Sequence, residues 1–209
     1  MYLPNAFRED DPETLVSFMR AHSFATLVSL LDGSPVASHI PLIVGWQGGV
    51  VSLRGHLAMP NPQWRVFGSG ESLAIFSGPH AYISPSLYEK RESVPTWNYM
   101  AVHAYGSPRI FRLAESREAV KAMLEAMIET YDPSYKSQWD ELSDGFREGM
   151  LNGIVGFEMV VTRLEGKYKL SQNRSQADQQ RVAASLSQSP DPTVSAVGRA
   201  MRAHLGWEG

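Results

Sequence analysis

Cysteine is absent from this sequence of 209 residues. Its absence excludes disulfide bonds, thiolate metal sites and a cysteine nucleophile, and it fits a reducing compartment, so we expect a cytoplasmic protein. Long apolar runs are also missing. No stretch reaches the length of a membrane-spanning helix, and the opening residues turn acidic at Glu9 before a signal peptide could develop. The 19 basic and 22 acidic residues leave a net charge of −3, which provides no global attraction for nucleic acid.

Common catalytic motifs are missing as well. The sequence has no G-x-S-x-G elbow and no P-loop, and Gly68-Ser69-Gly70 lacks the third glycine of a dinucleotide fingerprint. The six histidines are scattered, and no pair has the spacing of a helical zinc motif, so we expect no metal site. Carboxylates concentrate between Glu115 and Glu148, away from the β-rich segments, which gives little support to paired-carboxylate hydrolysis. No catalytic residue can be named.

What the sequence does contain is a series of β-strand patterns joined mostly by short turns. About seven strands are predicted. They lie at Phe24–Leu31, Val36–Val44, Val51–Leu57, Leu73–Ser77 (resuming at Ala81–Ser84 after Gly78-Pro79), Val94–Phe111, Ile154–Leu164 and, after a turn at Glu165-Gly166, Lys167–Leu170. Pro41 inside the second strand indicates an edge position or a bulge.

Helices are predicted at the start, in the middle and at the end of the chain. Asp11, Ser175 and Asp191 are expected N-caps, and an amphipathic stripe runs from Val120 to Tyr131. Clustered strands with tight turns favour an antiparallel sheet or barrel over alternating βαβ units. We therefore predict a mainly β, α+β protein: an antiparallel β-barrel core with peripheral helices.

The most informative stretch is Ser52–Trp64, S-L-R-G-H-L-A-M-P-N-P-Q-W. Arg54 and His56 alternate with apolar residues, so one face of the predicted strand is polar, and Gly55 leaves room for a ligand or another backbone. Asn61-Pro62 then begins a helix, and a polar strand that runs into a helix N-terminus can bind an anion. The same pattern also suits a solvent-facing strand followed by a proline-rich turn.

Polar and aromatic side chains gather in four clusters within the predicted strands. A flat heteroaromatic ligand with a phosphate would need this mixture, because cations and hydroxyls hold phosphate, aromatic rings stack and amides bond the ring edge. Alternatively, the aromatic residues belong to the core and the lysines to a solvated strand. The clusters are Ser38-His39, Arg54-Gly55-His56, Thr96-Trp97-Asn98-Tyr99 and Lys169-Leu170-Ser171-Gln172-Asn173-Arg174.

Five ordered motifs span almost the whole chain: M-Y-L-P-N-A-F-R-E-D-D, L-R-G-H-L-A-M-P-N-P-Q-W, A-I-F-S-G-P-H-A-Y-I-S-P, V-P-T-W-N-Y-M-A-V-H-A-Y-G and R-L-E-G-K-Y-K-L-S-Q-N-R. Together they resemble the PaiB-like family, described as FMN-binding negative transcriptional regulators. The resemblance implies a split β-barrel and a homodimer with FMN at the subunit interface. We accordingly expect an FMN-binding barrel domain at 1–174, with a helical segment inserted at 115–150, and a C-terminal helical extension at 175–209.

The resemblance also implies where the flavin lies. Arg54, Gly55 and His56 would contact it, with Arg54 a candidate for the phosphate, while Thr96–Tyr99 would line the ring or come from the partner subunit and Lys169–Asn173 would close the site. The full predicted cofactor-binding set is Ser38, His39, Arg54, Gly55, His56, Asn61, Trp64, Thr96, Trp97, Asn98, Tyr99, Lys169, Ser171, Gln172 and Asn173.

Three functions remain open from the sequence. The family resemblance implies a flavin-containing repressor that acts directly on DNA or through a regulatory protein, although no helix-turn-helix is evident and basic residues concentrate only between Arg163 and Arg181. The alternative is an FMN-dependent oxidoreductase of the flavin reductase or pyridoxamine-phosphate oxidase kind, in which the cofactor carries the redox chemistry. The third hypothesis is haem or small-ligand binding through one of the histidines.

Overall fold

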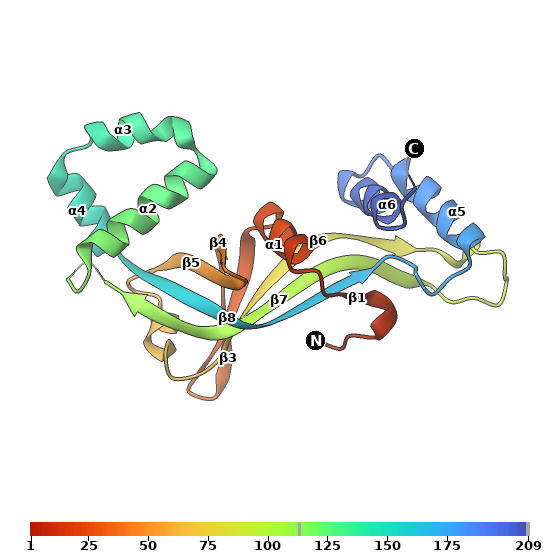
Figure 1. Ribbon diagram of the computed structural model, residues 1–209, viewed down its shortest axis with the longest axis horizontal. Helices are drawn as coiled ribbons and strands as arrows, with labels where there is room; N and C mark the ends of the chain where they lie inside the picture. The colour runs from red at the N-terminus through yellow and green to blue at the C-terminus, as the bar shows by residue number, and fades with distance from the viewer. Residues whose placement is uncertain (113, 208–209) are drawn as a thin grey trace. The chain divides into compact units, whose positions relative to one another are not determined.

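The computed structural model describes residues 1–112 and 114–207. Within these residues the chain forms eight strands and six α-helices (Figure 1). The strands are β1 (Arg8–Glu9), β2 (Phe24–Leu31), β3 (Ser34–Pro41), β4 (Ile43–Gln47), β5 (Val50–Ala58), β6 (Ser72–Ile83), β7 (Thr96–Phe111) and β8 (Ile154–Lys169). The α-helices are α1 (Pro12–Ala21), α2 (Arg117–Tyr131), α3 (Lys136–Glu141), α4 (Asp144–Asn152), α5 (Gln176–Ser187) and α6 (Pro192–His204). Short 3₁₀ turns lie at Asn5–Phe7, Pro62–Val66, Pro85–Leu87 and Pro133–Tyr135.

The strands form one sheet in the order β3-β2-β6-β7-β8-β5-β4, and β1 pairs with β8 beside this path. The pairs β1–β8, β2–β3, β2–β6, β4–β5 and β5–β8 are antiparallel. The predicted mainly β fold with peripheral helices is therefore confirmed. Pro41 ends β3, which is the edge strand at one end of this order, as its position in a predicted strand indicated.

The chain divides into two compact units. Unit 1 comprises residues 1–18, 77–102 and 165–209, and unit 2 comprises residues 19–76 and 103–164. The long strands β6, β7 and β8 contribute residues to both units. The expected domain boundary at residue 174 stays a prediction, and each unit is described by itself below.

Unit 2 contains the barrel core. Alternate residues of β5 are buried, and those between them are half-exposed, as the sequence pattern predicted. The buried side chains of β2, β5 and β8 include Leu27, Leu53, Leu57, Phe157 and Met159. The β2–β3 hairpin turns at Asp32 (φ 52°) and Gly33 (φ 78°), which is the two-residue turn that an Asp-Gly pair favours.

Helix α2 of unit 2 buries part of the predicted amphipathic stripe. Val120, Met123 and Met127 are buried along one side of the helix. At its end Tyr131 remains partly exposed, and its hydroxyl donates to Leu42 O at 3.2 Å. Within the described residues, no helix is both long and apolar enough to span a bilayer.

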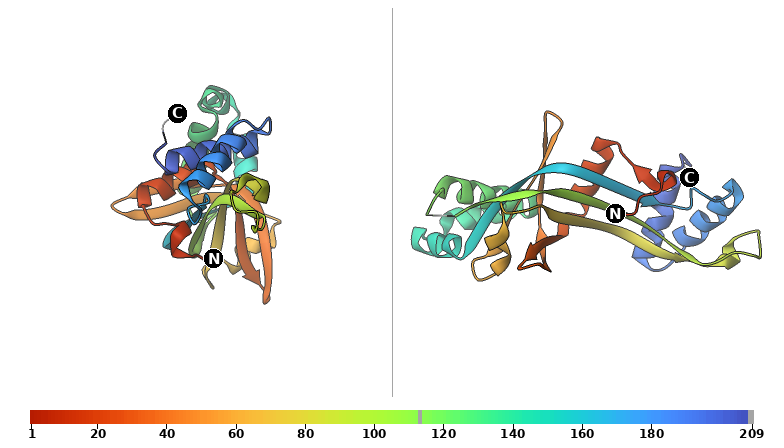
Figure 2. Two further views of the ribbon diagram at one scale, coloured as in Figure 1. Left: turned by 90° about the vertical axis from the view of Figure 1, so that its right-hand side faces the viewer. Right: turned by 90° about the horizontal axis from the view of Figure 1, so that it is seen from below.

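Unit 1 ends in the helical hairpin of α5 and α6, which lie side by side in Figure 2. Ser175 Oγ accepts from Asp178 N at 3.2 Å, and Asp191 Oδ1 accepts from Thr193 N at 2.8 Å, so the predicted N-caps of these two helices are confirmed. The helices approach closely at Gly198, where a Cβ would lie 2.4 Å from Ser187 N. This close approach requires glycine.

Two predicted breaks are wrong, and both fall at glycines. β8 continues through the expected turn at Glu165-Gly166 because Gly166 pairs with Glu9 of β1, and a Cβ there would lie 2.6 Å from Glu9 O. β6 likewise continues through Gly78-Pro79, since Gly78 lies against the Phe18 ring. At both positions a neighbouring group occupies the space that a side chain would need, and the chain does not turn there.

Candidate functional site

The polar face of β5 lies in unit 2. Ser52, Arg54 and His56 are half-exposed on one side of the strand, and Gly55 is buried on the other. A Cβ on Gly55 would lie 2.9 Å from Leu42 Cδ2 and 3.2 Å from Pro41 O. The sequence predicted that Gly55 leaves room for a ligand or for another backbone, and the structure shows another backbone close to it.

Arg54 and His56 have polar side-chain atoms without an ion pair or hydrogen-bond partner among the described residues. Across β8, Arg54 is opposite Glu158, but Glu158 pairs with Arg109 at 3.5 Å. In the described part of the chain no carboxylate lies within 4.0 Å of the Arg54 guanidinium. His56 Nδ1 is buried and has no hydrogen-bond partner there either, and burial lowers the pKa of His56. The face therefore combines a cation without an ion pair and a neutral imidazole.

A hydrogen-bond network joins two of the predicted residues beside this strand. Asn61 Nδ2 donates to Ser38 Oγ at 2.8 Å, and Ser38 Oγ donates to Gln63 Oε1 at 2.6 Å. Gln63 N donates to Asn61 Oδ1 at 2.9 Å, which confirms Asn61 as the N-cap, although the helix that follows is a 3₁₀ turn. Gln63 Nε2 donates to Leu27 O at 2.9 Å and to Ser29 Oγ at 3.1 Å. Gln63 is 1% exposed and connects the network to the core.

The other two predicted residues of unit 2 make local contacts. His39 Nδ1 lies 3.0 Å from Thr26 Oγ1 on the neighbouring strand. Trp64 Nε1 donates to Met59 O at 3.0 Å, and the guanidinium carbons of Arg65 and Arg112 lie 5.7 and 5.9 Å from the centre of a Trp64 ring. Two guanidinium groups thus lie near the Trp64 ring.

In unit 1, the start of β7 presents aromatic rings on one face and buries the other. Trp97 is 53% exposed, so it is not a core aromatic residue, and the His80 and Tyr82 rings each lie 5.9 Å from it. Asn98 is fully buried, and its Nδ2 donates to Ser171 Oγ at 2.8 Å. Asn98 Oδ1 has no partner within the described residues.

The segment after β8 is held close to this strand. Lys169 Nζ hydrogen-bonds to Thr96 Oγ1, and Gln172 Oε1 accepts from Leu170 N at 2.7 Å. Ser171 has φ 67°, the left-handed conformation. Asn173 is exposed. Gln172 therefore shapes the loop, and the loop places Ser171 against Asn98.

The predicted cofactor-binding residues thus fall into two groups, one in each unit. Direct contacts join Ser38 with Asn61 in unit 2, and Thr96 with Lys169 and Asn98 with Ser171 in unit 1. The predicted set omitted Gln63, although it lies inside the N-P-Q-W motif between two residues that were chosen. The set also omitted Lys167, which shares a strand face with Lys169 by simple alternation. The flavin roles of all fifteen residues remain predictions.

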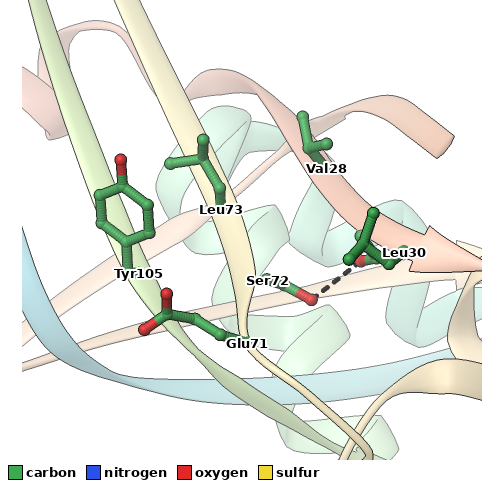
Figure 3. A pocket seen from close by; sticks show the side chains of 7 residues that line it. Val28, Leu30, Glu71, Ser72, Leu73 and Tyr105 are labelled. Atoms are coloured by element: carbon green, nitrogen blue, oxygen red, sulfur yellow. Dashed lines mark hydrogen bonds between the residues drawn. The ribbon is translucent and has the colours of Figure 1, made fainter. Parts of the chain in front are cut away.

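Unit 2 also has a shallow pocket on the outer side of β2, β6 and β7, lined by none of the predicted residues (Figure 3). Its volume is about 180 Å³. Val28, Leu30, Leu73 and Tyr105 surround it, and Ser72 hydrogen-bonds to Ser29 at 2.8 Å. No set of three or more His, Asp or Glu side chains in the described ranges could hold a metal ion.

Comparison with known proteins decides the family. A family model described as "Putative FMN-binding domain" matches residues 1–163. The chain belongs to this FMN-binding family. It is 39% identical over 206 residues to protease synthase and sporulation protein PAI 2 of Bacillus subtilis, and the match covers 98% of each chain. The PaiB-like resemblance is therefore confirmed.

Solved structures agree in fold. The FAD and haem binding protein of Mycobacterium smegmatis matches with a TM-score of 0.56 at 15% identity, covering 85% of this chain and 79% of that one. The flavocytochrome Anf3 of Azotobacter vinelandii matches with a TM-score of 0.57 at 15% identity, covering 78% and 69%. At such low identity these matches establish the fold, which is the split β-barrel that the sequence motifs implied.

The family assigns FMN as the cofactor, and the residues of unit 2 fit this group. Arg54 is a cation without an ion pair in the described residues, suited to a phosphate, and it shares its strand face with the half-exposed His56 imidazole. Ser52 adds a hydroxyl on the same face. When bound, FMN supplies reversible redox chemistry.

Proposed function

We propose that the protein is an FMN-binding repressor of transcription that works as a homodimer. The observation that carries this proposal is the polar face of β5, where Arg54 has no ion pair and His56 Nδ1 has no partner among the described residues. Arg54 would hold the FMN phosphate, and the neutral His56 would bond the ring. A relative whose name refers to sporulation and protease synthase supports a regulatory role.

Exposed apolar side chains in unit 2 support the homodimer. Phe24 and Leu30 on β2 are 69% and 63% exposed, and Val160 on β8 is 51% exposed. Large exposed apolar groups are typical of surfaces that another protein covers. A second copy would cover them and, as the family resemblance implies, would bring FMN to the subunit interface.

The repressor would reach its target either by contacting DNA or by binding a regulatory protein. The basic side chains between Arg163 and Arg181 are the candidates for a phosphate-backbone contact. The alternative function is that of an FMN-dependent oxidoreductase. It can be distinguished from a repressor because an oxidoreductase must turn over its substrate repeatedly.

The proposal is tested with purified full-length protein loaded with FMN. We expect a dimer by light scattering and salt-sensitive binding to the promoter of a regulated gene, tighter than to random DNA of equal length. Equal affinity for both DNAs would overturn direct repression, and recovery of specific binding on addition of a regulatory protein would assign the indirect route. Repeated oxidation of NADH or NADPH would instead establish the oxidoreductase.

A further inference from the structure

Unit 1 carries a pair of lysines on one face of β8. Lys167 and Lys169 are two residues apart in the strand, so their side chains share a face, about 7 Å apart. Lys167 is only 7% exposed. Its Nζ donates to Tyr2 O at 3.0 Å and lies 5.4 Å from the ring centres of both Tyr2 and Tyr99. A cation with so little exposure is normally paired with an anion.

No such anion is present in the described protein. Neither lysine has a carboxylate oxygen within 4.0 Å there. The nearby acids have other partners: Glu165 binds the amino group of Met1, and Glu9 Oε1 accepts from Asp11 N at 3.0 Å. Among the described residues, Lys167 and Lys169 therefore place two positive charges on one strand face with no carboxylate within 4.0 Å.

The charges around Lys169 also favour a bound anion. Burial lowers the pKa of Lys169, and the positive charges of Lys167 and Arg174 lower it further. Within the described residues, Lys169 Nζ hydrogen-bonds only to the neutral hydroxyl of Thr96. The two lysines on this strand face thus repel each other, and an anion beside them would offset the repulsion.

We propose that Lys167 and Lys169 bind a phosphate monoester. A phosphate suits the cluster because it carries close to two negative charges and three acceptor oxygens. The Tyr2 and Tyr99 rings lie beside Lys167, and the low exposure of Lys167 strengthens its attraction for an anion. The phosphate belongs either to FMN, in which case this inference rests on the proposed function and the two lysines hold the phosphate in place of Arg54, or to a second phosphorylated ligand.

The test is a titration of the full-length protein with inorganic phosphate, followed by calorimetry. We expect Lys169→Met and Lys167→Met each to weaken phosphate binding by about tenfold or more, since each removes a charge-assisted bond. Lys167→Arg keeps the charge and should bind. Lys90→Met is the matched control, because Lys90 is exposed in the same unit and has no ion pair within the described chain. Thermal unfolding checks that every variant is folded.

Unchanged phosphate affinity in both methionine variants, or no binding by the wild type, would overturn the site. Comparing FMN with riboflavin, which lacks the phosphate, identifies the source. If the phosphate is that of FMN, Lys169→Met weakens FMN but not riboflavin, and saturating FMN abolishes phosphate binding. If a second ligand supplies it, FMN-loaded protein still binds phosphate. A protein that binds phosphate but no flavin would support this site and overturn the proposed function.

Discussion

Arg54 and Glu158 lie opposite each other on β5 and β8, yet the Glu158 carboxylate pairs with Arg109 at 3.5 Å. The geometry leaves the Arg54 guanidinium without an ion pair within residues 1–112 and 114–207. A half-exposed cation beside an unpartnered imidazole is a poor structural element but a suitable anion contact.

Replacing this cation should weaken FMN binding selectively. We expect Arg54→Ala to raise the Kd for FMN by about tenfold or more, because a charge-assisted bond to phosphate is lost, and to leave riboflavin affinity almost unchanged. Fluorescence quenching of the flavin measures both constants. Lys121→Ala, at an exposed position on α2, is the control. Equal loss for FMN and riboflavin would assign Arg54 to the ring or to folding.

His56 should make stability depend on pH. Burial lowers its folded-state pKa below the usual value of 6.5, so the unfolded state binds the proton more readily. The contribution to stability is complete above about pH 6.5 and is lost as the pH falls toward the folded-state value. Urea unfolding between pH 7.5 and 5 should show a smaller loss of stability in His56→Gln than in the wild type. An equal loss of stability in the two proteins would show that the pKa of His56 is the same in the folded and unfolded states.

Gln63 should contribute to stability through its network. Gln63→Ala removes the side-chain donor to Leu27 O and one hydrogen bond each of Ser29 and Ser38, so we expect a loss of about 1–3 kcal/mol in the free energy of unfolding. Gln47→Ala, at an exposed position, should change it by less than about 0.5 kcal/mol. Urea titrations compare the two. Similar small effects would mean that water replaces the network.

Gly166 should tolerate no side chain. A Cβ would lie 2.3 Å from Leu15 Cδ2 and 2.6 Å from Glu9 O, so Gly166→Ala must displace β1 or α1. We expect a loss of about 1–3 kcal/mol by urea unfolding, the usual result of overpacking. Gly70→Ala, where nothing lies within 4 Å, is the matched control. Equal stability of the two variants would show that β1 can move away from the added methyl group.

Local chemistry explains what the sequence predicted correctly. The Asp32-Gly33 turn depends on two backbone conformations, and the caps at Ser175 and Asp191 depend on groups two or three residues away. The alternation of β5 likewise follows from strand geometry. Such features need no knowledge of distant residues.

Distant contacts explain what the sequence could not predict. Gly78 and Gly166 resemble turn residues until Phe18 and Glu9 are seen against them. Lys167 resembles a solvated lysine until Tyr2, far away in sequence, is placed beside it. The flavin itself was predicted from the order of five motifs and not from the chemistry of any one residue.

The most direct test of the central claim is flavin titration of the purified protein. If the protein is isolated with its cofactor, it should release FMN on denaturation. If it is isolated without flavin, it should bind added FMN at one site per chain. In both cases the yellow flavin absorbance should increase with the fraction of sites occupied. A colourless protein that binds no added FMN would contradict the proposal that this split barrel is an FMN-binding regulator.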